Sequence, residues 1–118
     1  FLRFIERART EMLRAIDASH AAMMHETKTQ FVVRRCVLDY LKPAHLDEEL
    51  TVRSDILECG GASLSLQQEV WRGNTLLVRA EIGLACINGN SEPCRIPAAI
   101  RGKIDAFIGA SMKASPRA

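Results

Sequence analysis

Apolar residues recur at helical spacing over the first sixteen residues, FLRFIERARTEMLRAI. Ile5, Ala8 and Met12 fall on one face of a helix, while the arginines and glutamates fall mainly on the rest of its surface. An isolated helix of this length is marginal in water, because most helical stability comes from packing the apolar face. The pattern therefore predicts an amphipathic helix over residues 1–16 that packs against a sheet.

Between residues 30 and 88 the pattern changes from helical to alternating. Residues 30–40, 50–59, 63–72 and 75–88 are predicted strands, and the last three are joined by turns that contain glycine. The first strand is apolar on both sides, with Phe31, Val33 and Val37 on one face and Val32, Cys36, Leu38 and Tyr40 on the other. Such a strand needs cover on both faces, or a partner chain along its edge.

Short elements flank this sheet. Ser19 is positioned to cap a second, short helix that ends at about Thr27. Pro97 is expected at the first position of a closing helix whose apolar stripe comprises Ile100, Ile104, Phe107 and Ile108. Residues 111–118 are interpreted as a polar tail that need not be ordered. The order of elements predicts an α+β domain over residues 1–110, with one long helix laid on an antiparallel sheet.

Composition limits the classes of function. A chain of 118 residues with 47% hydrophobic and 25% charged residues fits one domain with one core. A net charge of +2 and 5% aromatic residues give no reason to expect a nucleic-acid partner. No apolar run approaches the roughly 20 residues of a membrane span, and no signal-peptide pattern is present, so a cytoplasmic protein is expected.

The chain has four cysteines, at positions 36, 59, 86 and 94, and none forms a Cys-x-x-Cys pair. None of the three histidines shares a ligand-like spacing with a cysteine. We therefore expect buried, reduced thiols, with no metal and no cofactor.

The segments FLRFIERARTEMLRAI, QFVVRRCVLDYLKPAHLDEELTV, GGASLSLQQEV, TLLVRAEIGLACIN and CRIPAAIR together resemble the Tol-Pal-associated acyl-CoA thioesterases, relatives of 4-hydroxybenzoyl-CoA thioesterase in the hotdog superfamily. The resemblance runs to about residue 104. It implies a five-stranded antiparallel sheet wrapped around the central helix. It also implies a homodimer or homotetramer, paired edge to edge through the strand at residues 30–40.

The resemblance implies hydrolysis of a small or medium acyl-CoA, or of an acyl carrier protein thioester, at a site between subunits. The N-terminus of the central helix would offer its N–H groups to the thioester oxygen. The family places an aspartate and a histidine before this helix, and the present sequence begins after both, and after the family's first strand. We therefore expect an N-terminally truncated chain.

Several residues of this chain are candidates for the site. Glu6, one and a half turns into the helix, is the catalytic candidate, although an ion pair with Arg3 or Arg9 is the plainer interpretation. The candidates for acyl-group contacts are Phe31, Val32, Val33 and Ser63, and those for the CoA phosphates are Arg34 and Arg95. Sheet core, hairpin turn and solvated arginines are the alternatives for these residues.

Two other hypotheses stay open from the sequence. One is a non-catalytic module of the same fold that binds acyl-CoA or acyl carrier protein. The other is a cystatin-like or other α+β fold with an unrelated pocket, in which the central helix would lack a buried N-terminus.

Overall fold

The computed structural model describes residues 2–43, 48–108 and 111–114. Two helices, α1 (Leu2–Ala15) and α2 (His20–Glu26), come first in the chain. Four strands follow, β1 (Gln30–Tyr40), β2 (Thr51–Cys59), β3 (Ser63–Arg72) and β4 (Thr75–Ile87), and then helix α3 (Ala98–Phe107) and strand β5 (Ser111–Ala114). The predicted helices and the four predicted strands are thus confirmed, with ends shifted by one or two residues.

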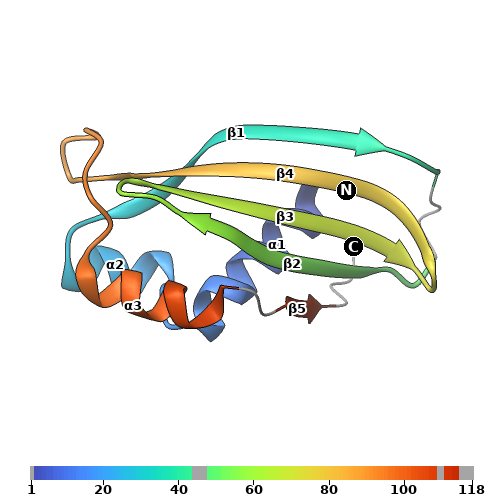
Figure 1. The fold of residues 1–118 in the computed structure, drawn as a ribbon, viewed down its shortest axis with the longest axis horizontal. Coiled ribbons are helices and arrows are strands. Elements are labelled where there is room, and N and C mark those ends of the chain that lie inside the picture. Colours follow the sequence, from blue (N-terminus) through green and yellow to red (C-terminus); the bar gives the residue numbers. More distant parts are fainter. Residues whose placement is uncertain (1, 44–47, 109–110, 115–118) are drawn as a thin grey trace.

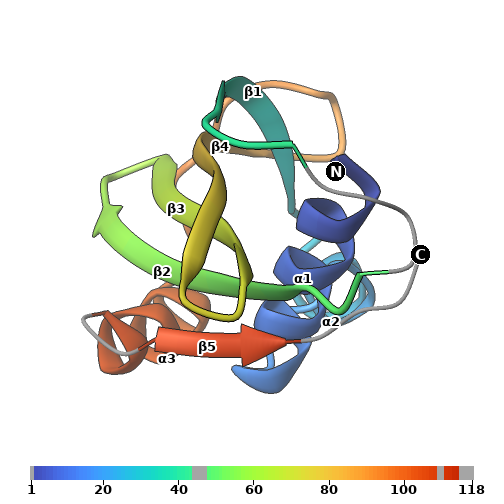
Figure 2. The same cartoon turned by 90° about the vertical axis from the view of Figure 1, so that its right-hand side faces the viewer.

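The strands form one antiparallel sheet in the order β1-β4-β3-β2-β5. All three helices lie on the same side of this sheet, with α1 crossing beneath the strands and α2 and α3 below one end of it (Figures 1 and 2). β1 and β5 are the two edges of the described sheet. β1 therefore presents an unpaired row of backbone groups to a partner.

The core lies between α1, α3 and the inner face of the sheet. Ile5, Ala8 and Met12 are buried, as the helical spacing predicted. The inner face of the sheet contributes mainly branched aliphatic side chains, namely Val52, Ile56, Leu64, Leu66, Val70, Val78, Ile82 and Leu84. Burial of each large apolar side chain stabilises the fold by about 1.5 to 3 kcal/mol before the entropy of ordering is counted.

The helix boundaries follow from local chemistry. The hydroxyl oxygen of Ser19 accepts a hydrogen bond from the backbone N–H of Ala22 at 3.2 Å, so Ser19 caps α2 as predicted. Asp17, between the two helices, has a φ of 60°, a left-handed conformation that ends α1. Pro97 is the N-cap of α3 and not its first residue, and Ile108, expected in the apolar stripe, is 40% exposed.

Two features of the sheet differ from the sequence-based prediction. Ser111–Ala114, expected in the polar tail, forms β5 beside β2, because the unpaired edge of β2 can hydrogen-bond any backbone that reaches it. Residues 115–118, the rest of that tail, lie outside the described residues. The second difference is in β1, where the register against β4 shifts between Val33 and Arg35. This bulge places one extra residue, Arg34, in the strand.

The bulge changes which residues of β1 share a face. Phe31 and Val33 pair with Cys86 and Leu84, and Cys36, Leu38 and Tyr40 pair with Ile82, Ala80 and Val78, all of which are core residues of β4. Directly paired residues point to the same face of a sheet. Phe31, Val33 and Cys36 therefore lie on the inner face together. Simple alternation had assigned Cys36 to the opposite face from Phe31 and Val33, and that assignment was wrong.

Candidate functional site

Glu6 lies on the solvent side of α1. Its side chain is exposed, and it lines an open hollow on the helix surface together with Arg3, Arg7 and Thr10. Electrostatic interaction with Glu6 raises the pKa of Arg9, although burial, the larger effect, leaves that pKa below its ordinary value. The structure thus couples Glu6 to Arg9, which is one of the two arginines that the ion-pair interpretation named.

A buried polar network lies beneath the same part of α1. Gln68 of β3 is completely buried, and its amide group donates to the carbonyl oxygen of Ile5 at 3.0 Å and to the hydroxyl of Ser54 at 2.9 Å. Its carbonyl oxygen accepts from Nη1 of Arg9 at 3.1 Å. The network joins α1 to β2 and β3, and it fixes the first two turns of the helix above the sheet.

Arg9 carries this network towards the β1 edge. Cys36, on the inner face of β1, is one of its electrostatic neighbours, and half-buried Arg9 stays cationic at neutral pH despite its lowered pKa. A guanidinium group has five N–H donors, of which one is directed at Gln68. Arg9 is therefore chemically suited to hold an oxygen ligand near the start of α1. The sequence prediction named Arg9 only as an ion-pair partner and missed Gln68 and Ser54.

The candidates on β1 do not form one group. Phe31 and Val33 lie on the inner face, whereas Val32 pairs with Ala85 and lies on the outer face. Phe31 packs against the core, and Val33 is 51% exposed. Arg34 occupies the bulge and is exposed. A channel on the inner face would be lined by Phe31 and Val33 and not by Val32.

Ser63 and Arg95 both lie at the turn between β2 and β3. A Cβ atom added to Gly60 would lie 2.8 Å from the Ser63 hydroxyl oxygen, and one added to Gly61 would lie 3.9 Å from Nη1 of Arg95. Ser63 also pairs with Ala85, so it shares the outer-face row of Val32. The structure therefore brings Ser63 and Arg95 to one end of the sheet. It separates both from the inner-face pair Phe31 and Val33.

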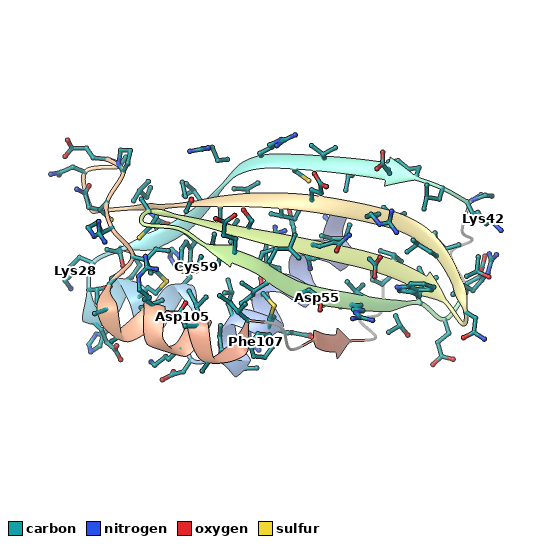
Figure 3. All side chains as sticks on the ribbon, viewed as in Figure 1. Lys28, Lys42, Asp55, Cys59, Asp105 and Phe107 are labelled. Carbon is teal, nitrogen blue, oxygen red and sulfur yellow. The ribbon has the colours of Figure 1, made fainter. Side chains whose placement is uncertain are left out.

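Arg101 of α3 also binds this turn, and no pattern in the sequence pointed to it. Nη2 of Arg101 donates to the carbonyl oxygens of Gly60 and Gly61. The neighbouring Cys59 lies at the end of β2 above α3, where Asp105 is one of its electrostatic neighbours (Figure 3). Burial raises the pKa of the Cys59 thiol, and Arg101 partly opposes this shift. These contacts make the turn a rigid platform between β2, β3 and α3.

The four cysteines differ in exposure. Cys86 is buried, Cys59 and Cys94 are half-buried, and Cys36 is exposed, so the expectation of buried thiols was wrong for Cys36. The bulge at Arg34 accounts for this, because it turns Cys36 to a part of the inner face that the helices do not cover. Within residues 2–43, 48–108 and 111–114, no group of three or more histidine, cysteine, aspartate or glutamate side chains is placed to hold a metal ion.

The same fold and sequence pattern occur in known proteins. The sequence profile of the thioesterase superfamily matches residues 1–79. The chain belongs to the thioesterase superfamily. It is 32% identical over 102 residues to the acyl-CoA thioesterase YbgC of Haemophilus influenzae, covering 86% of this chain and 75% of that protein. It is 40% identical over 89 residues to the acyl-CoA thioester hydrolase YbgC of Escherichia coli O6:H1, covering 75% of this chain and 66% of that one.

Among solved structures of this superfamily, a thioesterase of Thermus thermophilus complexed with coenzyme A and Zn is similar to this chain. The TM-score is 0.77 at 29% identity, and the match covers 92% of this chain and 78% of that one. The α+β hotdog fold implied by the resemblance is confirmed. The cystatin-like alternative was wrong, because the matched thioesterase structure shares the arrangement of the sheet and helices.

Membership of the superfamily also fits the shape of the molecule. No helix in the described part of the thioesterase chain is long and apolar enough to cross a membrane. The central helix of the fold is α1, and the strand that the family uses for pairing subunits corresponds to β1.

Proposed function

We propose that this chain is a subunit of an acyl-CoA thioesterase, which hydrolyses the thioester of a small or medium acyl-CoA or of an acyl carrier protein. One observation carries the proposal: the sequence similarity to the two YbgC proteins, which are named for this activity, extends over at least three quarters of this chain. The coenzyme A complex of the Thermus thermophilus protein supports the same substrate class. The relatives described above do not favour the alternative of a non-catalytic binding module.

The start of α1 is the proposed position of the thioester carbonyl. Backbone N–H groups at a helix N-terminus, together with the helix dipole, stabilise the negative charge that develops on that oxygen. The contacts of Gln68 with Ile5 and Arg9 support this proposal, since they fix the first turns of the helix. Donors that are fixed before the reaction need no reorganisation during it.

We propose that two subunits pair through β1 and that each site lies between them, in a homodimer or homotetramer. Support comes from the unpaired backbone edge of β1 and from its exposed apolar side chains, among them Val33, Val37 and Tyr40. Pairing two β1 strands would satisfy that edge and cover these side chains. A partner subunit would also complete the inner-face surface beside Phe31 and Val33.

Individual residues then receive proposed roles. Glu6 is the candidate acid or base of this chain, although its side chain is exposed to solvent and has no enclosed pocket around it. Phe31 and Val33 are proposed to contact the acyl group. Arg95, beside Ser63 at the Gly60–Gly61 turn, and Arg34 in the β1 bulge are proposed to bind the phosphates of CoA. A cytoplasmic site of action stays a prediction.

Hydrolysis can be tested by following the loss of thioester absorbance of acyl-CoA, for this chain and for a parent chain that carries residues upstream of Phe1. Thiol reagents are less suitable, because the chain contributes four cysteines of its own. If the parent chain supplies an acid or base before α1, it should hydrolyse acyl-CoA about 10² to 10⁴ times faster than this chain. Calorimetric titration with CoA should show binding by both.

Equal turnover by the two chains would place the chemistry within this chain. Glu6→Gln would then test the glutamate, with Glu11→Gln, one turn and a half further along α1, as the matched control. Loss of activity in Glu6→Gln alone, with the circular dichroism spectrum unchanged, would assign the catalytic role to Glu6. Absence of both hydrolysis and CoA binding in the parent chain would contradict the proposed function.

A further inference from the structure

Two thiols face each other beside the end of β4. The Sγ atoms of Cys86 and Cys94 are 3.5 Å apart. The backbone N–H of Cys94 donates to the carbonyl oxygen of Cys86 at 3.0 Å, and the next pair along, Ile87 and Pro93, forms an isolated antiparallel bridge. Cys86 and Cys94 are therefore directly opposite neighbours on two antiparallel segments, which is the arrangement that brings side chains closest together.

The two thiols have different surroundings. Cys86 is completely buried, and Cys94 is half-buried. Burial, followed by the hydrogen bond with Cys94, raises the pKa of the Cys86 thiol to about 12. Cys86 therefore stays protonated at neutral pH and is a poor first nucleophile, because only the thiolate attacks. Cys94 is the thiol of the pair that a dissolved oxidant meets first.

We propose that Cys86 and Cys94 are a peroxide-sensitive dithiol that closes to an intramolecular disulfide. In the first step the Cys94 thiolate attacks hydrogen peroxide, an S–O bond forms, the O–O bond breaks, and the departing hydroxide takes a proton to become water. In the second step the Cys86 sulfur attacks the Cys94 sulfenic acid, the S–O bond breaks, and the Cys86 proton leaves with the hydroxyl as water. Overall, two thiols and one peroxide give one disulfide and two waters.

The contacts around the pair indicate which segment moves. A disulfide has an S–S length of about 2.05 Å, so the sulfur atoms must approach by about 1.5 Å. On the β4 side, Cys86 is held by its pairing with Phe31 and by the hydrogen bond from its N–H to the carbonyl oxygen of Ala62. The adjustment therefore falls on the connection between β4 and α3, at residues 88–97. This connection carries Arg95, so the disulfide would tie that residue more firmly to the sheet.

The test is a peptide map of the purified protein after reduction and treatment with hydrogen peroxide. Trypsin cleavage at Arg79 and Arg95 releases residues 80–95, which contain both cysteines. We expect this peptide to lose two hydrogen atoms in mass and to resist alkylation, and dithiothreitol should restore both alkylation sites. A peptide that keeps two alkylatable thiols while Cys36 is oxidised would overturn the proposal.

Two variants make the result specific. Cys94→Ser should abolish the loss of two hydrogen atoms, whereas Cys36→Ser, which removes the exposed thiol, should leave it unchanged. Cys94→Ala provides a second variant should the serine disturb folding. The rate of closure should not depend on protein concentration, because the reaction is intramolecular. A bridge that requires Cys36, or one that forms faster at higher protein concentration, would overturn the proposal, and neither outcome depends on thioesterase activity.

Discussion

The side-chain amide nitrogen of Gln68 lies 3.0 Å from the backbone carbonyl oxygen of Ile5, and this hydrogen bond joins the middle of β3 to the second turn of α1. The same side chain also binds Ser54 and Arg9. A completely buried amide with partners on three elements holds the helix in one position along the sheet. The position of the start of α1, and with it the proposed thioester site, therefore depends on a residue of the sheet.

Replacing Gln68 by leucine should destabilise the protein by about 1–3 kcal/mol, because Ser54 and Arg9 lose a buried partner. Urea unfolding measures this change. Gln67→Leu is the matched control, since the neighbouring glutamine lies on the outer face of the same strand, and its effect should stay within about 0.5 kcal/mol. Equal effects of the two substitutions would show that the buried network contributes no net stability.

Val33→Lys should dissociate the proposed dimer. An unpaired charge in a dry interface is strongly disfavoured, and Val33 is 51% exposed on the β1 edge strand of the described chain. Sedimentation equilibrium at micromolar concentration should show dimer or tetramer for the original chain and monomer for this variant. Leu57→Lys is the control, because Leu57 is 53% exposed on β2, away from that edge. A Val33→Lys variant with unchanged mass would move the interface elsewhere.

Arg95→Glu should weaken CoA binding by about 10- to 100-fold, the equivalent of one charge-assisted hydrogen bond to phosphate. Calorimetric titration with CoA measures the change in the dissociation constant. Arg14→Glu makes the same charge reversal on an exposed arginine of α1 and should have little effect. If both variants bind CoA with the original affinity, the phosphates do not lie at the Gly60–Gly61 turn, and Arg34→Glu becomes the next variant to measure.

Stability should fall as the pH rises from about 9 to about 12, because the pKa of Cys86 is raised from an ordinary 9.0 to about 12. In that window the unfolded chain releases the thiol proton and the folded chain retains it, so higher pH favours unfolding. Urea unfolding at several pH values gives the slope of the free energy of unfolding. Cys86→Ala should have a shallower slope, since other titrating groups remain. Identical slopes would mean that Cys86 titrates alike in both states.

Much of the fold was predictable from local patterns in the sequence. The helical spacing of Ile5, Ala8 and Met12 predicted the buried face of α1, and Ser19 predicted the start of α2. These predictions succeeded because the periods of helices and strands, and the hydrogen bonds of helix caps, depend on residues close together in the chain. The resemblance to the hotdog thioesterases then supplied the arrangement of the sheet around the helix.

The candidate site was less predictable, although part of the signal was present. Gln68 and Ser54 occupy positions in their strands where the alternation expects an apolar residue, as Leu66 and Val70 on either side of Gln68 show. Such an out-of-phase polar residue indicates a buried hydrogen bond. Its partners, Ile5 and Arg9, are distant in the sequence, so the pattern alone could not name them.

The sequence by itself determined the helices, the four strands of the predicted sheet and the apolar face of each element, because local periodicity encodes them. Only the tertiary structure decided which way β1 faces beyond Arg34, that Ser111–Ala114 joins the edge of β2, and that Cys86 meets Cys94. A bulge, an edge pairing and a contact between thiols each depend on the register of a segment against a partner. That register is set by packing between residues that are separated along the chain, and no single segment specifies it.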